Sequence, residues 1–194
     1  MKTLLIATKN PNKVREVEGI LGHVFRFETL PGDVPEVEED GATFLENALK
    51  KARQYSRLTS LPTLAEDSGL VVDALDGAPG VYSARFAGQD ADAAANNRLL
   101  LERLAGVSDD RRTARFVCCL VYTDGGREEI FEGEVRGRIA RCASGSSGFG
   151  YDPLFIPDGH DRTFADMPAQ MKNSMSHRKR ALMKFADSLH SASK

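Results

Sequence analysis

Acidic residues are grouped at two places in the chain where carboxylates could hold a metal ion. Four lie between positions 36 and 40, and Asp67 is followed by Ser68 and Gly69. Mg²⁺ prefers oxygen ligands, commonly one or two carboxylates with phosphate oxygens and water. We expect Asp67 to stand at a strand end, where Gly69 lets the backbone turn away. Glu66 should then point the opposite way. The acidic group at 36–40 is either part of this site or a solvated loop.

The residues between a first apolar strand and the next helix are suited to hold an anion. They are Thr8, Lys9, Asn10, Pro11, Asn12 and Lys13. Free backbone N–H groups and the helix dipole favour negative charge at such a turn. A cation at position 13 opposes the dipole, and a bound phosphate would remove that conflict. The alternative is an ordinary capped helix with a solvated lysine. No Walker A sequence occurs in the chain.

The segment 145–153, G-S-S-G-F-G-Y-D-P, holds two aromatic residues between glycines and beside a carboxylate. Its glycine spacing is not the dinucleotide fingerprint. Phe149 and Tyr151 could stack on a base, which contributes roughly 1–3 kcal/mol. Asp152 could accept hydrogen bonds from a base edge, and Gly150 lies between these side chains. The alternative is a flexible loop with Phe149 in the core.

The segment 172–180 is rich in cations. Ser176 has the character of an N-cap, yet the next four residues, from His177 to Arg180, can all carry positive charge. Cations at a helix N-terminus repel one another and the dipole unless an anion or a base acceptor lies among them. The alternative is a basic surface patch. Together, the four segments supply a phosphate-binding turn, metal carboxylates, stacking aromatics and cations, and that combination predicts a nucleotide site.

The elements that must position these residues alternate between strand and helix in the first half of the chain. We expect strands at 3–8, 25–30, 63–66, 70–72, 114–123 and 128–138. We expect helices at 11–21, 43–58, 91–104 and 176–189, a long loop at 76–88 and a Gly/Ser loop at 144–150. The pattern, with a hairpin turn at 124–126, predicts an α/β protein with a mixed sheet. Strand order does not follow from the pattern.

Length and composition predict one folded domain over residues 1–194, built of two lobes around a cleft. A formal net charge of -2 argues against binding to nucleic acid as a bulk polyanion. No apolar run approaches the roughly 18 residues of a membrane span. The 3 cysteines, Cys118, Cys119 and Cys142, do not resemble a disulfide framework, and we expect them to be reduced core residues in a cytoplasmic protein.

Six motifs in order resemble those of the inosine triphosphate pyrophosphatase family, the non-canonical purine NTP pyrophosphatases. They are T-x-N-x-x-K at 8–13, E-x-G-x-T-F-x-E-N-A at 39–48, D-S-G-L at 67–70, G-A-P-G-V-Y-S-A-R at 77–85, F-G-Y-D-P at 149–153 and S-H-R at 176–178. The resemblance covers nearly the whole chain. Two positions depart from it: Lys9 stands where many relatives have a small residue, and Glu66 where many bacterial relatives have Asp.

The resemblance implies a two-lobed α/β fold with a central mixed sheet, a cleft between the lobes and a homodimer. It implies hydrolysis of ITP, dITP and XTP to the monophosphate and pyrophosphate with Mg²⁺. The triphosphate would be held by the turn at 8–13, and Ser68 would contact the substrate. Asp67 would be metal ligand or general base, and Glu39 a further metal ligand. Residues 149–152 would bind the base, and the remaining base and phosphate contacts would come from Lys172, His177 and Arg178. The motif at 77–85 has no implied catalytic role.

Water must attack a phosphorus that is surrounded by negative charge, so catalysis should consist mostly of positioning and charge neutralisation. We expect Lys13 and Lys172 to stabilise the pyrophosphate leaving group, while Asp67 or the metal activates water. Hypoxanthine and xanthine present an acceptor at O6 and a donor at N1, the reverse of adenine. We therefore expect Asp152 to take the N1 proton, and Arg178 or backbone N–H groups to serve O6.

Two other interpretations remain at this point. A Maf-type nucleotide pyrophosphatase would have a Ser- and Arg-rich first phosphate loop, which segment 8–13 lacks. A nucleotide-sensing or RNA-binding module would use the cations at 177–180 and would have no need of Asp67 and Glu39. Its RNA binding would depend steeply on salt.

Overall fold

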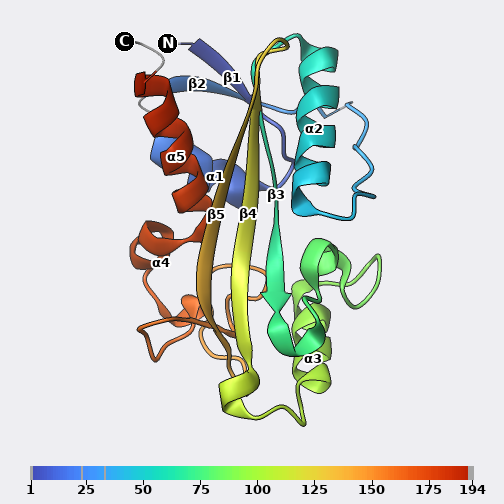
Figure 1. The fold of residues 1–194 in the computed structure, drawn as a ribbon, viewed down its shortest axis with the longest axis vertical. Helices are drawn as coiled ribbons and strands as arrows, with labels where there is room; N and C mark the ends of the chain where they lie inside the picture. Colours follow the sequence, from blue (N-terminus) through green and yellow to red (C-terminus); the bar gives the residue numbers. More distant parts are fainter. Residues whose placement is uncertain (1, 23, 33, 192–194) are drawn as a thin grey trace. The chain divides into compact units, whose positions relative to one another are not determined.

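The computed structural model describes residues 2–22, 24–32 and 34–191 (Figure 1). Within these residues, strands form one sheet in the order β2-β1-β3-β4-β5-β6. The strands are β1 (Lys2–Ile6), β2 (Phe25–Thr29), β3 (Thr63–Val72), β4 (Thr113–Thr123), β5 (Glu128–Ile139) and β6 (Phe155–Pro157). The α-helices are α1 (Pro11–Leu21), α2 (Phe44–Thr59), α3 (Ala93–Arg103), α4 (Ala169–Met175) and α5 (His177–Ser191).

The sheet is mixed, which confirms the predicted fold class. β1 pairs in parallel with both β2 and β3, whereas β5 and β6 are antiparallel. Parallel strands need crossover connections. α1 connects β1 to its neighbour β2, and α2 lies on the connection from β2 to β3, the neighbour of β1 on its other side. β4 and β5 are sequential neighbours joined by the predicted turn, where Asp124 Oδ1 accepts from the backbone N–H groups of Gly126 and Arg127.

Local signals set the starts of the first two helices. Asn10 caps α1 by accepting from the N–H of Asn12, and Pro11 occupies the first helical position. Thr43 caps α2 by accepting from the N–H of Glu46 at 3.1 Å. The bounds of α1 are those predicted. Several short elements were not predicted, among them β6, α4 and a 3₁₀ segment at Gly80–Arg85 inside the expected long loop.

The prediction of two separate strands at 63–66 and 70–72 is wrong. β3 runs without a break from Thr63 to Val72, so Asp67 lies in its interior and not at a strand end. Asp67 is also buried, with 5% of its surface exposed. Burial is tolerated because neighbouring side chains bind the carboxylate, as described below.

The chain divides into two compact units. The first contains the described residues of Met1–Asp67, Cys118–Gly133 and Arg178–Lys194, and the second contains Ser68–Val117 and Glu134–His177. Each unit has its own apolar core. That these units are two lobes of one domain, with a cleft between them, stays a prediction.

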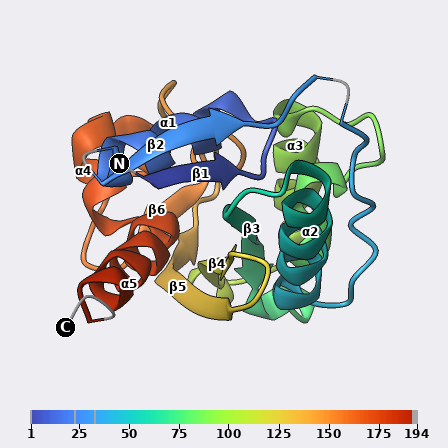
Figure 2. The same ribbon diagram turned by 90° about the horizontal axis from the view of Figure 1, so that it is seen from above.

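The core of the first unit gathers side chains from β1, α1, β2, β4 and α5. Its largest members include Leu4, Leu21, Leu120 and Phe185, all of them fully buried. The Phe185 ring stacks on Phe25 with 5.9 Å between centroids. Within this unit, α2 lies on the opposite side of β4 and β5 from α5, as both ribbon views show (Figure 2). The helices therefore cover both faces of this part of the sheet.

The core of the second unit is aromatic. The Phe116 ring lies 4.7 Å from that of Phe155 and 6.2 Å from that of Phe164, measured between centroids. Leu100 and Leu104 of α3 belong to the same cluster. This core holds the loop at 144–153 through Tyr151, one of its buried members.

All three cysteines are free thiols. Cys118 and Cys119 are buried as predicted, but Cys142 is exposed, so its assignment to the core is wrong. Among the described residues, the helices are too short or too polar to span a membrane.

Candidate active site

The two predicted metal ligands, Asp67 and Glu39, lie against the same lysine in the first unit. Glu39 Oε1 is 2.6 Å from Lys51 Nζ, and Asp67 Oδ1 is 3.6 Å from the same nitrogen. Lys51 comes from α2 and is buried. The two carboxylates thus already share one positive charge. This donor set fits Mg²⁺, which commonly takes one or two carboxylates and completes its shell with phosphate and water.

The motif at 39–48 builds this arrangement. Asn47 Nδ2 donates to Asp67 Oδ2 at 3.0 Å, and Asn47 Oδ1 accepts from the N–H of Gly41 at 2.8 Å. A Cβ atom at Gly41 would lie 2.7 Å from Asn47 Oδ1, so only glycine lets the chain pass this close. Glu46 accepts from the N–H of Ala42 at 2.8 Å, one residue before the N–H of Thr43 that a capping box would use. The same short segment, residues 41–47, therefore both caps α2 and supplies the hydrogen bond to Asp67.

Burial raises the pKa of the Asp67 carboxyl above its usual value. The nearby Lys51 ammonium opposes this shift, the Glu39 carboxylate adds to it, and the Asn47 hydrogen bond opposes it. Desolvation is the largest of these effects and decides the direction. A carboxyl group with a raised pKa takes a proton more readily, which is the property required of a general base.

The turn at 8–13 has the geometry of a capped helix N-terminus. The N–H of Asn10 donates to Thr8 Oγ1 at 3.1 Å, and that of Asn12 donates to Asn10 Oδ1 at 2.9 Å. Lys9 reaches Glu36 at 3.5 Å, but this pair is largely exposed and weakly held. Both alternatives for this turn include a cap, so its presence does not choose between them.

Lys13 has a protein partner, because its Nζ lies 3.0 Å from Glu66 Oε1. The conflict between this cation and the dipole of α1 is therefore relieved by a carboxylate of the chain itself. Glu66 contacts Lys13 and Cys118, whereas Asp67 contacts Lys51 and Asn47. The two adjacent side chains thus have separate partners, in agreement with alternation along a strand.

Arg178 forms hydrogen-bonded ion pairs with two carboxylates in the first unit. Its Nε and Nη2 donate to the two oxygens of Glu66 at 2.6 and 2.9 Å, and its Nη1 donates to Glu16. Only 2% of Arg178 is exposed. Burial raises the pKa of Glu66, but the Arg178 and Lys13 cations outweigh it and hold that pKa well below its usual range. Arg178 is therefore no part of an exposed basic patch.

The predicted base-binding loop is organised around Asp152 in the second unit. Asp152 Oδ2 accepts from the N–H of Phe149 at 2.8 Å and from Lys172 Nζ at 2.6 Å. Gly148 has φ +80°, and a Cβ atom there would lie 2.2 Å from Asp152 Oδ2. Lys172 Nζ also lies 4.6 Å from the centroid of the Phe149 ring. Lys172 thus joins the aromatic and acidic members of the loop.

The two aromatics of this loop differ in exposure. Tyr151 is 4% exposed and belongs to the core, whereas Phe149 is partly exposed. The loop does contain a buried aromatic, but it is Tyr151 and not Phe149. His177 is also buried, and its ring stacks on Phe116 with 5.0 Å between centroids. Ser68 follows Asp67 in β3 and is partly buried.

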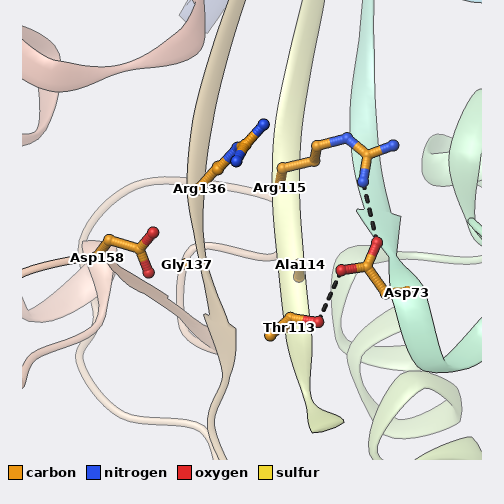
Figure 3. Close-up of a pocket in the computed structure, with 7 residues that line it drawn as sticks. All are labelled: Asp73, Thr113, Ala114, Arg115, Arg136, Gly137 and Asp158. Carbon is orange, nitrogen blue, oxygen red and sulfur yellow. Dashed lines mark hydrogen bonds and ion pairs between the residues drawn. The ribbon is translucent and has the colours of Figure 1, made fainter. Parts of the chain in front are cut away.

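A separate pocket of about 380 Å³ lies in the second unit and contains none of the predicted site residues (Figure 3). Three of its charged residues, Asp73, Arg115 and Arg136, are paired with one another or with their neighbours. Asp73 accepts from Thr113 at 2.7 Å and from Arg115 at 3.0 Å. Arg136 donates to Glu134 at 2.7 Å. These pairs account for the charges of Asp73, Arg115 and Arg136 without a ligand.

Lys51 and Asn47 are missing from the predicted site, although both contact Asp67. They lie four residues apart on α2, among the buried positions Ala48, Ala52 and Tyr55. A lysine and an asparagine on the buried face of a helix need polar partners, and that pattern was visible in the sequence. What the sequence could not show was which carboxylates would meet them.

Known proteins resemble this chain over nearly its whole length. The profile of the Ham1 family matches residues 4–188. A dITP/XTP pyrophosphatase of Geobacter sulfurreducens is 49% identical over 194 residues, covering 97% of each chain. A dITP/XTP pyrophosphatase of Symbiobacterium thermophilum is 53% identical over 192 residues, covering 97% of this chain and 95% of the relative. The structure of a HAM1 protein from Coxiella burnetii matches with TM-score 0.89 at 38% identity, covering 98% of this chain and 100% of the other.

Proposed function

The chain belongs to the Ham1 family, and on that premise we infer that it is a nucleoside-triphosphate pyrophosphatase. It hydrolyses non-canonical purine nucleoside triphosphates, dITP, XTP and ITP, to the monophosphate and pyrophosphate. The similarity to dITP/XTP pyrophosphatases at about half identity over nearly full length supports this activity. The bond cleaved is the anhydride between the α- and β-phosphates.

The observation that carries the proposal is the convergence of Asp67 and Glu39 on Lys51 in the first unit. Glu39 and Asp67 are far apart in sequence, and folding brings both to one cation. We propose that these two carboxylates hold Mg²⁺, which supplies positive charge to the phosphate oxygens when it is bound. Lys51 contacts both carboxylates and so holds them near each other.

We assign the base of the reaction to Asp67. In the proposed reaction it removes a proton from the attacking water, whose oxygen then bonds to the α-phosphorus. Asn47 holds the other carboxylate oxygen and so fixes the direction from which Asp67 can accept that proton. Pyrophosphate leaves with the electron pair of the broken anhydride bond, and Lys13 balances part of its charge.

The triphosphate binds at the turn formed by Thr8, Lys9, Asn10, Pro11, Asn12 and Lys13. The N-terminus of α1 supplies N–H groups and a favourable dipole for phosphate. Ser68 adds a hydroxyl next to Asp67 in the chain. Lys13 exchanges part of its pairing with Glu66 for the phosphate.

The base binds at the loop 149–152 of the second unit, with Phe149, Gly150, Tyr151 and Asp152 as its residues. The partly exposed Phe149 ring is suited to stack on a purine. We assign further base contacts to Lys172 and His177, which lie in the same unit. In this assignment Tyr151 acts from the core rather than by stacking.

Pyrophosphate release from ITP, XTP, dITP, ATP and GTP tests the proposal, with Mg²⁺ and with EDTA. We expect metal-dependent turnover of ITP, XTP and dITP, with ATP and GTP slower by orders of magnitude. Turnover of none of these, or of pyrimidine nucleotides instead, would reject it.

We also propose a homodimer and a cytoplasmic location, with no nucleic-acid or membrane partner. The free thiols of Cys118, Cys119 and Cys142 are consistent with a reducing compartment. Light scattering of the purified chain would give twice the monomer mass if the dimer exists.

A further inference from the structure

The motif at 77–85 covers an edge of β3 in the second unit. β1 pairs with β3 at Thr63 and Leu64, near the start of the strand. Further along, the N–H of Leu70 donates to Ser83 Oγ at 2.9 Å, and the N–H of Val72 donates to the carbonyl of Ala78 at 3.2 Å. Exposed strand edges need such partners, so this motif covers the part of β3 that follows the candidate catalytic carboxylate Asp67.

Ser83 makes three hydrogen bonds at one point of this motif. Its Oγ accepts from Leu70 and donates to the carbonyl of Gly80 at 2.6 Å. Its own carbonyl accepts from the hydroxyl of Tyr151 at 2.9 Å. The hydroxyl therefore uses its single proton and one lone pair, and the residue connects three motifs: D-S-G-L, the segment 77–85 and the base-binding loop.

The base-binding loop is held from a second direction by α3. Asn97 Nδ2 donates to the carbonyl of Gly150 at 3.1 Å. Gly150 thus has its carbonyl fixed, and Tyr151, the next residue, has its hydroxyl fixed on Ser83. Phe149 and Asp152, which we assign to the base, lie on either side of these two anchored residues. The anchors restrain the part of the chain between the two base contacts.

We propose that Ser83 and Tyr151 are positioning residues that set the base-binding loop for a purine with an O6 acceptor and N1 donor. This deepens the proposed function and rests on it. The buried Tyr151 ring fixes the position of the loop against the core, and its hydroxyl fixes the rotation of that ring. Hydrogen-bond recognition of a base edge fails when its groups move by about an ångström, so slack in the anchor weakens base binding and base choice.

The matched variants Tyr151→Phe and Tyr82→Phe test the hydrogen bond between the Tyr151 hydroxyl and the Ser83 carbonyl. Each variant removes one tyrosine hydroxyl, but Tyr82 is 59% exposed and lies within the motif at 77–85. Hydrogen–deuterium exchange of the ligand-free protein should be about fivefold faster at residues 148–152 in Tyr151→Phe, which is the effect of one lost hydrogen bond. Tyr82→Phe should match the wild type. Unchanged exchange in Tyr151→Phe would overturn the proposal.

Steady-state kinetics separate positioning from general stability. In Tyr151→Phe and Ser83→Ala, KM for ITP should rise roughly three- to tenfold with kcat within about twofold. The ratio of kcat/KM for ITP to that for ATP should fall. Ser83→Thr, which keeps the hydroxyl, should restore both. A fall in kcat with unchanged KM, or an unchanged ratio, would contradict the proposal.

The two readouts distinguish failure of this inference from failure of the proposed function. If the wild type hydrolyses none of the purine triphosphates, the proposed function fails, and the claim of base selection fails with it. If the wild type is active but Tyr151→Phe resembles Tyr82→Phe in exchange, KM and selectivity, only the positioning role is rejected.

Discussion

Lys51 and Asp67 form a buried ion pair between α2 and β3, with 3.6 Å between Nζ and Oδ1. Each is less than one-tenth exposed. Burial still raises the pKa of Asp67, so the lysine only partly offsets the cost of removing this carboxylate from water. The pair therefore holds a carboxylate that is poised to accept a proton.

Asp67→Asn should lower kcat for ITP by about 10²- to 10⁴-fold, the usual contribution of a general base. Asparagine keeps the size of the side chain and its contact with Asn47, so the fold should persist. Initial rates of pyrophosphate release measure the effect, and circular dichroism checks the fold. Turnover close to that of the wild type would contradict the assignment of Asp67 as the general base.

Lys51→Met should move the acid limb of the pH–rate profile to higher pH. Asp67 must be ionised to act as a base, so activity falls as the pH drops through its raised pKa. Because the ammonium of Lys51 lowers that pKa, its loss raises it further. The profile of kcat/KM against pH measures the shift.

Lys50→Met is the control for this charge. Lys50 is the neighbouring lysine, pairs with Asp40 at 2.6 Å and has a side chain that is 39% exposed. Its loss should leave the acid limb in place. An acid limb that moves equally in both variants, or moves to lower pH in Lys51→Met, would contradict the assignment.

Glu66→Gln should destabilise the fold by roughly 3–5 kcal/mol, because it leaves buried cations without their carboxylate. The pKa of Glu66 is depressed by Arg178 and Lys13. Its stabilisation is therefore complete above the pKa of the unfolded chain and is lost as the pH falls through the lower folded value. Urea unfolding at neutral and acid pH measures both effects, and the variant should lose part of the acid sensitivity of the wild type.

Glu128→Gln is the matched control for a bidentate arginine pair on the surface. Arg53 donates to both Glu128 oxygens at 2.7 and 2.8 Å, and its side chain is 50% exposed. Its loss should cost less than about 1 kcal/mol. Equal destabilisation by the two substitutions would show that burial does not increase the contribution of the Glu66 ion pairs to the free energy of unfolding.

Gly148→Ala should raise KM for ITP by about tenfold or more. The new Cβ atom would lie 2.2 Å from Asp152 Oδ2, so the Asp152 carboxylate would have to move. Gly159→Ala is the control, since Gly159 has the same φ of +80° with open space around its Cβ position. Both should lose about 1–2 kcal/mol of stability from the left-handed backbone. If KM changes equally in both, the Asp152 contact does not control base binding.

The sequence was most informative where a structure depends on neighbours along the chain. The cap at Asn10 with Pro11, and the capping-box sequence of Thr43 and Glu46, predict the starts of α1 and α2 correctly because their bonds close within one helical turn. The ordered motifs likewise predict the family without any knowledge of tertiary contacts. They are patterns in the sequence itself.

The sequence was misleading where a residue's partner is distant. The triplet from Asp67 to Gly69 resembles a break between strands, yet β3 continues through it, and Asn47 and Lys51 bind the carboxylate that the strand buries. β6 has only three residues and exists through its pairing with β5. No local pattern encodes either pairing.

The residue types, their order and the local caps were therefore determined by the sequence alone, and with them the family and the chemistry. Only the tertiary structure decided that Lys51 joins Glu39 to Asp67 and that Glu66 holds both Lys13 and Arg178. The physical reason is that a buried charge must find an opposite charge or a hydrogen-bond donor, and many side chains in the chain could serve. The packing of strands against helices decides which of these side chains lies next to the buried charge.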